Sequence, residues 1–210
     1  MLALTTFPLA AYCLFLTFLN RRRRPTVFSG TVDLMFLAFG LSGLFLSGPG
    51  RLLIPLPVLT LWKAGAWPIW LGFYLSVSLL VALKLRRRIV IYNFSAAEFV
   101  PRLWKIVRSL DTSAAHLGNS IAMPNCGVQF SINTAPRTRN VVLLATGPTQ
   151  SLRGWQQLET AIHRDFQTMT VSRGPSSWFF LVSTIVLFAI GFWSLSAQFP
   201  VVWEAVRESL

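Results

Sequence analysis

The sequence predicts an α-helical integral membrane protein with four transmembrane helices and an inserted two-layer α+β cytoplasmic domain. Three observations support this fold class. Of the 210 residues, 53% are hydrophobic and the mean hydropathy is +0.56, which is more apolar than a soluble domain of this length. Four apolar runs reach the roughly 20 residues needed to cross a bilayer. Between the third and fourth runs, the pattern of about ninety residues changes to amphipathic periodicity.

The predicted spans are residues 1–19, 28–47, 66–85 and 177–199. The first run is followed by Arg21–Arg24, whereas a secretory signal carries its positive charge before the apolar stretch. We therefore expect it to be a retained span. Residues 52–62 are apolar but too short to cross, and they contain Pro55 and Pro57. An interfacial segment on the outer leaflet is expected there, with a re-entrant loop as the alternative.

Basic residues set the predicted orientation, because cytoplasmic flanks of membrane spans are rich in lysine and arginine. Arg21–Arg24 follow the first span, and Lys84 with Arg86–Arg88 follow the third. The opposite side receives few basic residues, namely Arg51, Lys63 and Arg207. Both termini are therefore expected outside, with residues 87–176 cytoplasmic, and the bacterial inner membrane is the expected location. This gives three parts: spans in 1–86, the α+β domain in 87–176, and the fourth span with a short outer tail in 177–210.

The insert should begin with a short strand and a helix. Ile89–Tyr92 is rich in β-branched residues, and Ser95 is expected to start a helix with Glu98 in a capping box. Pro101 is expected to kink the helix or to separate its first turn. Apolar residues recur at helical spacing on its predicted buried face, at Phe99, Leu103, Ile106, Val107 and Leu110.

Three strands and a second helix should follow. Residues 119–123 and 127–133 are predicted strands joined by a turn at 124–126, and 140–146 is predicted to be an inner strand covered on both faces. A helix is expected at about 151–169. Its predicted apolar side consists of Trp155, Leu158, Ile162, Phe166 and Met169. Two helices packed on one sheet make a two-layer α+β domain.

The sequence offers few groups for catalysis. His116, expected in a loop, and His163, expected on an exposed helix side, are the only histidines, and the two cysteines are far apart, at Cys13 and Cys126. There is no glycine-rich phosphate loop, metal motif or closely spaced carboxylate pair, so we expect no enzyme activity, no metal and no cofactor. The competing hypothesis is an enzyme that uses Cys126 with a histidine, and it requires a strongly lowered thiol pKa.

Asp33 is the one acidic residue inside a predicted span. Intramembrane acids often mark ion or proton pathways, which gives the alternative hypothesis of a small transporter or ion-coupled component. However, Asp33 lies near the positively polarised start of its helix and close to the arginine cluster, where a carboxylate is stabilised. A structural role is therefore expected, with ion coupling kept as the alternative.

A basic surface is predicted next to the membrane, and we expect it to contact anionic lipid headgroups. Its residues are Arg86, Arg87, Arg88, Arg102, Lys105 and Arg108. A simply solvated charged face is the competing interpretation. Nucleic acid is disfavoured as a partner because Trp104 stands alone, without the interleaved aromatic residues of single-strand binders.

Small residues in two predicted spans should allow close helix packing, in particular Gly40, Ser42, Gly43, Ser47, Gly191, Ser194 and Ala197. The functional hypothesis from the sequence is a non-enzymatic multi-pass protein. Its cytoplasmic domain would serve as an assembly or regulatory partner of another membrane protein.

Overall fold

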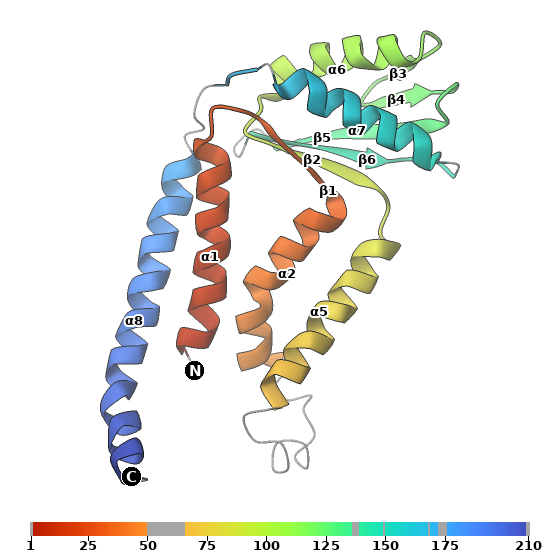
Figure 1. The fold of residues 1–210 in the computed structure, drawn as a ribbon. Coiled ribbons are helices and arrows are strands. Elements are labelled where there is room, and N and C mark those ends of the chain that lie inside the picture. The colour runs from red at the N-terminus through yellow and green to blue at the C-terminus, as the bar shows by residue number, and fades with distance from the viewer. Residues whose placement is uncertain are drawn as a thin grey trace. The chain divides into compact units, whose positions relative to one another are not determined.

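The computed structural model describes residues 2–49, 66–135, 139–148, 150–167, 169–171 and 176–208. The described chain contains six helices and one six-stranded antiparallel sheet (Figure 1). Residue contacts divide it into two compact units. Unit 1 consists of Met1–Thr17, Leu34–Leu83 and Trp178–Leu210, and unit 2 of Phe18–Asp33 and Lys84–Ser177. The predicted segment at 52–62 lies outside the described residues.

Unit 1 is built from four helices that are long and apolar enough to cross a membrane, as predicted. They are α1 (Leu2–Arg21), α2 (Gly30–Ser47), α5 (Ala66–Lys84) and α8 (Ser176–Glu208). Two boundaries differ from the prediction. α8 continues beyond residue 199, so the expected tail begins as helix, and α2 starts at Gly30 because residues 26–29 form a strand.

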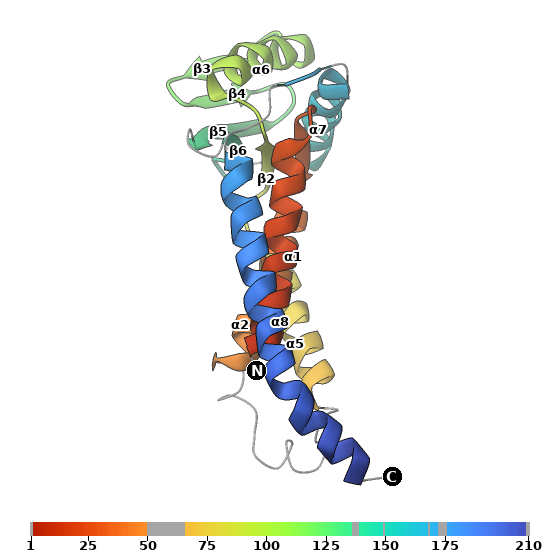
Figure 2. The same ribbon diagram turned by 90° about the vertical axis from the view of Figure 1, so that its left-hand side faces the viewer.

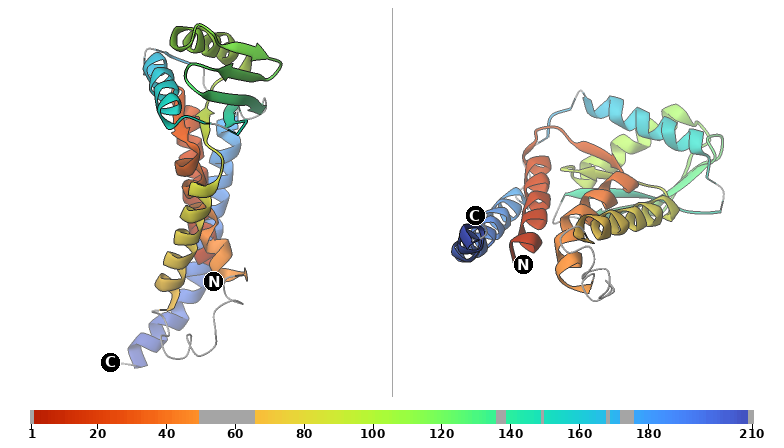
Figure 3. Two further views of the ribbon diagram at one scale, coloured as in Figure 1. Left: turned by 90° about the vertical axis from the view of Figure 1, so that its right-hand side faces the viewer. Right: turned by 60° about the horizontal axis from the view of Figure 1, so that its bottom comes forward.

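The four helices of unit 1 pack side by side in the spatial order α8, α1, α2, α5. Figure 2 shows α1 beside α8, and the right-hand view of Figure 3 shows the full order. Ring contacts join each neighbouring pair, with centroid separations of 5.4 Å for Phe7 and Phe192, 4.2 Å for Phe15 and Phe36, and 4.4 Å for Phe45 and Tyr74. The Tyr74 hydroxyl also donates a hydrogen bond to the Ala38 carbonyl oxygen at 3.1 Å, which fixes α5 to α2.

Glycines permit these helices to approach closely, as predicted for Gly40, Gly43 and Gly191. A Cβ atom at Gly43 would collide with the Leu4 carbonyl oxygen and lie 2.8 Å from the Cα of Thr5. At Gly191, a Cβ atom would lie 2.8 Å from Oγ1 of Thr6. Backbone approach of this kind increases packing between helices that gain no hydrophobic free energy from leaving lipid.

Unit 2 contains the sheet, whose strand order is β1-β2-β6-β5-β4-β3. The strands are β1 (Thr26–Ser29), β2 (Arg88–Tyr92), β3 (Ala115–Leu117), β4 (Ser120–Met123), β5 (Val128–Ala135) and β6 (Asn140–Ala145). The four strands predicted from the sequence are confirmed as β2, β4, β5 and β6. β1 and β3, the two edge strands, were not predicted.

β1 is the chain segment between α1 and α2. It pairs antiparallel with β2 over its whole length, from Thr26 opposite Tyr92 to Ser29 opposite Ile89. Val27 enters the core of unit 2 and is 6% exposed. The assignment of residues 28 and 29 to a span was therefore wrong, because hydropathy alone does not separate a buried strand from the start of a transmembrane helix.

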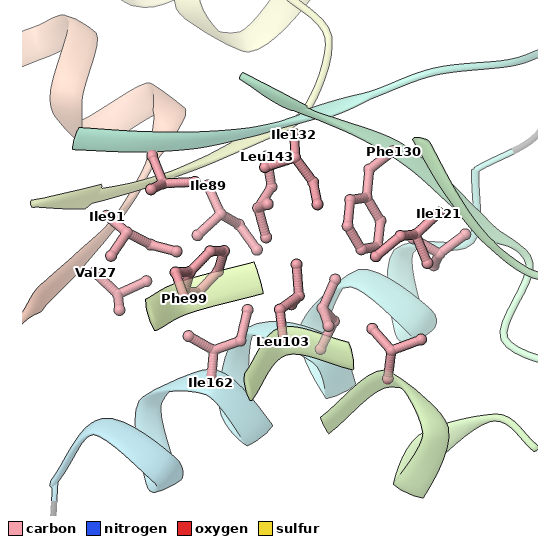
Figure 4. Close-up of a cluster of buried hydrophobic side chains, with 14 of the residues drawn as sticks. Val27, Ile89, Ile91, Phe99, Leu103, Ile121, Phe130, Ile132, Leu143 and Ile162 are labelled. Atoms are coloured by element: carbon pink, nitrogen blue, oxygen red, sulfur yellow. The ribbon is translucent and has the colours of Figure 1, made fainter. Parts of the chain in front are cut away.

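Two helices, α6 (Ala96–Leu110) and α7 (Leu152–Gln167), cover one face of the sheet (Figure 1). Figure 4 shows the apolar core between the helices and the sheet. The predicted buried faces are confirmed, although Ile106, Leu110 and Met169 are only partly buried. The core side chains include Ile91, Phe99, Leu103, Val107, Phe130, Ile132, Leu143, Trp155, Leu158 and Ile162.

Three local predictions in unit 2 need correction. Ser95 is the N-cap of α6, but its side chain makes no capping hydrogen bond, and the amides of Glu98 and Phe99 donate to the Ser95 carbonyl oxygen instead. Pro101 lies inside the single helix α6, so the separate first turn was wrong, whereas the alternative of a kink stays a prediction. In addition, β6 is buried on alternate residues only, because the helices cover just one face of this strand.

We predict that Gly43→Val will destabilise the folded protein by about 1 to 3 kcal/mol, because the added side chain forces α1 away from α2. Gly72→Val in α5 is the matched control, since a Cβ atom at Gly72 meets nothing within 4 Å. Thermal unfolding of the full chain in detergent measures both effects. Equal unfolding temperatures for the two variants would show that the close α1–α2 contact does not contribute to stability.

Candidate functional site

Asp33 lies in the first turn of α2 and is paired with side chains of β2. Its Oδ2 atom is 3.3 Å from Nη2 of Arg88, and the Tyr92 hydroxyl donates a hydrogen bond to Oδ1. Asp33, Arg88 and Tyr92 are called the Asp33 cluster below. A cation, a phenol and the positive end of a helix all stabilise this carboxylate.

The alternation of side chains along β2 brings the Asp33 cluster together. Ile89 and Ile91 point into the core, so Arg88 and Tyr92 lie on the other face of the sheet. The first turn of α2, which directly follows β1, meets β2 on that face. Gly30 leaves room at this turn for the Arg88 side chain, with which a Cβ atom there would collide.

The end of α1 is also bonded to unit 2 through its backbone. The Nδ2 atom of Asn93 donates to the Arg22 carbonyl oxygen, and the Val171 amide donates to the Arg23 carbonyl oxygen, each at 2.7 Å. Asn93 has a φ of 60°, a left-handed conformation that asparagine tolerates better than most residues. The backbone of the Arg21–Arg24 cluster is thus held in place while its side chains are exposed.

The six residues predicted to contact anionic lipid have different surroundings. Arg86, Arg87 and Lys105 are exposed, whereas Arg88 belongs to the Asp33 cluster. The other two have partners on the helices. The Arg102 Nη1 atom lies 3.9 Å from Oδ2 of Asp165, and the Arg108 guanidinium lies 5.0 Å from the ring centre of Trp104.

Asp111 follows α6 and organises the turn between β4 and β5. Its carboxylate accepts hydrogen bonds from the Ser113 hydroxyl at 2.6 Å, the Ser113 amide at 2.9 Å and the Asn125 amide at 2.8 Å. It also accepts from the Asn125 side chain and, at 3.4 Å, from the Cys126 amide. Hydrogen bonds from the Ser113 hydroxyl and these backbone amides hold the pKa of Asp111 below its usual value, although burial opposes the shift. No local sequence pattern predicts this arrangement, because the turn between β4 and β5 brings its members together.

The residues considered for catalysis lie on different elements of unit 2, with Cys126 between β4 and β5, His116 on β3 and His163 on α7. Burial raises the pKa of the Cys126 thiol and the nearby Asp111 carboxylate adds to the rise, which is opposite to the shift that a nucleophilic cysteine needs. His116 lies on the exposed strand β3 rather than in a loop, 5.6 Å from the Trp104 ring. His163 is exposed on α7, as predicted. Among the described residues, no group of three or more His, Cys, Asp or Glu side chains could hold a metal ion.

We predict that Asp33→Asn will destabilise the protein by about 1.5 to 3 kcal/mol, because Arg88 loses a charged acceptor in a partly buried position. Glu98→Gln is the control, since it removes an exposed carboxylate from the first turn of α6. Thermal unfolding in detergent measures the difference. The ion-coupling alternative instead expects Asp33→Asn to abolish ion flux in vesicles without changing the unfolding temperature.

We predict that Asp111→Asn will lower stability at pH 7 and flatten the acid limb of the stability profile. A carboxylate with a lowered folded-state pKa contributes fully above its unfolded pKa of about 3.9, and that contribution disappears as the pH falls through the folded pKa. The deficit of the variant should therefore be constant from pH 7 to about 5 and then shrink. Ser113→Ala should show a smaller change of the same sign, and pH-dependent thermal melts test both variants. A deficit that grows on acidification would contradict this role.

Family models, curated proteins and solved structures were compared with the chain, and none matches it.

Proposed function

We propose that this multi-pass membrane protein anchors unit 2 as a cytoplasmic interaction domain and acts as a non-enzymatic assembly or regulatory partner of another membrane protein. The observation that carries the proposal is the pairing of β1 with β2. β1 connects two candidate spans, and only residues 85–87 separate β2 from a third. The sheet therefore includes chain segments directly attached to three apolar helices.

This arrangement suits a docking domain that works next to a membrane. The Asp33 cluster ties α2 to β2, and the bonds to the Arg22 and Arg23 carbonyl oxygens tie the end of α1 to two further segments of unit 2. Such a domain cannot diffuse away from its anchors. A partner that lies in the same membrane then meets it at a high effective concentration.

Charge supports a cytoplasmic location for unit 2. It holds 16 of the 19 basic residues of the chain but only 5 of the 7 acidic ones. By the positive-inside rule, both termini are then outside, and the bacterial inner membrane is the proposed location. Anionic headgroups of the inner leaflet would be attracted by about 1 kcal/mol for each nearby basic residue. The exposed side chains of Arg21–Arg24, Arg86, Arg87 and Lys105 provide this attraction.

The orientation and the partner can both be tested with the full chain. In a variant with Cys13 and Cys126 replaced by serine, Thr112→Cys should react with a membrane-impermeant maleimide only after spheroplasts are permeabilised. Gly48→Cys, directly after the C-terminal end of α2, should react in intact spheroplasts. Thr112 and Gly48 are both exposed, so access to the reagent depends on the side of the membrane. Labelling of Thr112→Cys in intact spheroplasts would invert the proposed orientation.

A photo-crosslinking amino acid at exposed positions of unit 2, such as Gln156 and Gln157, should give adducts with one membrane protein in native membranes. The same amino acid at Gln129, which lies on the sheet face opposite the helices, serves as a matched exposed control. Recovery of the same mixture of proteins from all positions would contradict a specific docking role.

A further inference from the structure

A groove of about 460 Å³ lies on the surface of unit 2 and is formed by α6 and α7. Most of its lining comes from one side of α7, and the end of α6 closes it. The lining residues that carry the argument are Ser109, Arg153, Gln156, Gln157, Thr160 and Arg164. Except for one leucine and one alanine, the lining is polar.

The only charged residues that line this groove are arginines. Arg153 and Arg164 are both exposed, and neither has an ion-pair partner among the described residues. Asp165, the acidic neighbour of Arg164, is paired with Arg102 at 3.9 Å. The two guanidinium groups are therefore available to bind an anion.

The spacing of the two arginines indicates the size of the ligand. They are eleven positions apart along the helix, which places their Cα atoms on one side of α7 about 16 Å apart. An extended polypeptide covers that distance with about five residues. Between the arginines, Gln156, Gln157 and Thr160 supply amide and hydroxyl groups that can bond a peptide backbone.

Other anionic ligands fit this groove less well. No aromatic residue lines it, so the bases of single-stranded nucleic acid would have no surface on which to stack. The two arginines are spaced by about three turns of α7, which is farther than a single headgroup phosphate reaches. This spacing favours an extended polypeptide over one lipid headgroup.

We propose that the groove between α6 and α7 binds an extended acidic peptide segment, through Arg153 at one end and Arg164 at the other. The inference rests on the proposed function, since the segment would belong to the partner membrane protein. It also assigns the docking surface to α7 rather than to the basic side of α6.

The test uses the full chain in nanodiscs of neutral phosphatidylcholine and a fluorescein-labelled octapeptide of alternating glutamate and serine. The peptide should bind at moderate salt, and Arg153→Glu with Arg164→Glu should weaken binding by at least about tenfold. The control pair Lys105→Glu with Arg108→Glu makes the same charge change outside the groove and should weaken binding less than about threefold. Unfolding temperatures of all variants are measured to show that they fold.

A second variant separates a shaped site from diffuse attraction. Ala161→Trp fills the groove without changing charge, and we expect it to reduce peptide binding by at least about tenfold. The proposal would be overturned if Ala161→Trp left the peptide affinity unchanged, or if the unmodified protein did not bind the peptide. Equal losses of peptide affinity in the two charge-reversal pairs would also overturn it. So would a groove variant that loses binding to phosphatidylglycerol vesicles rather than to the peptide, because the groove would then be a headgroup site.

The crosslinking experiment distinguishes failure of this inference from failure of the proposed function. A partner adduct that persists in the Arg153→Glu, Arg164→Glu variant would leave the docking role intact and refute the groove. If the unmodified protein gave no adduct but still bound the peptide in nanodiscs, the docking role would be refuted. The proposal that the groove binds an acidic peptide would then stand.

Discussion

The antiparallel pairing of β1 with β2 is the constraint on which unit 2 depends. A four-residue strand between two apolar helices must pair its backbone groups, and β2 provides the partners. This pairing places Val27 in the core and sets the first turn of α2 against Arg88 and Tyr92. The Asp33 cluster, the position of Gly30 and the attachment of two spans to the sheet all follow from it.

Two of the five acidic residues of unit 2 have structural roles. Asp33 neutralises Arg88 beside a helix start, and Asp111 gathers the amides and hydroxyl of a turn. The partners of Asp33 give a structural role to a carboxylate inside an apolar run. Because Asp165 pairs with Arg102, the acidic side chains of unit 2 with no hydrogen bond or ion pair among the described residues are those of Glu98 and Glu159. Exposed basic side chains therefore outnumber exposed acidic ones in the described part of unit 2.

Periodicity and hydropathy were sufficient to predict the four apolar helices, α6, α7 and four of the six strands. These signals are local, so residues such as Phe99, Leu103 and Trp155 could be assigned from spacing alone. The failures are non-local. β1 finds its partner more than sixty residues away, as Thr26 opposite Tyr92 shows, and the partners of Asp33 lie on that same strand. Asp111 and Cys126 meet through a turn, and Ser109 meets Arg164 only because two distant helices pack side by side.

The sheet itself offers little opportunity for a partner to add a strand. One edge is β1, which continues directly into α2, and the other is β3, which is only three residues long. Short or covered edges prevent association through backbone pairing. The face that carries the Asp33 cluster is occupied at β2 by the first turn of α2. The groove of the proposed peptide site lies in the helical layer, where two arginines with no ion-pair partner among the described residues lie on a single side of α7. The proposed docking would therefore depend on side chains of a helix pair, where attractive and repulsive contacts together can set specificity.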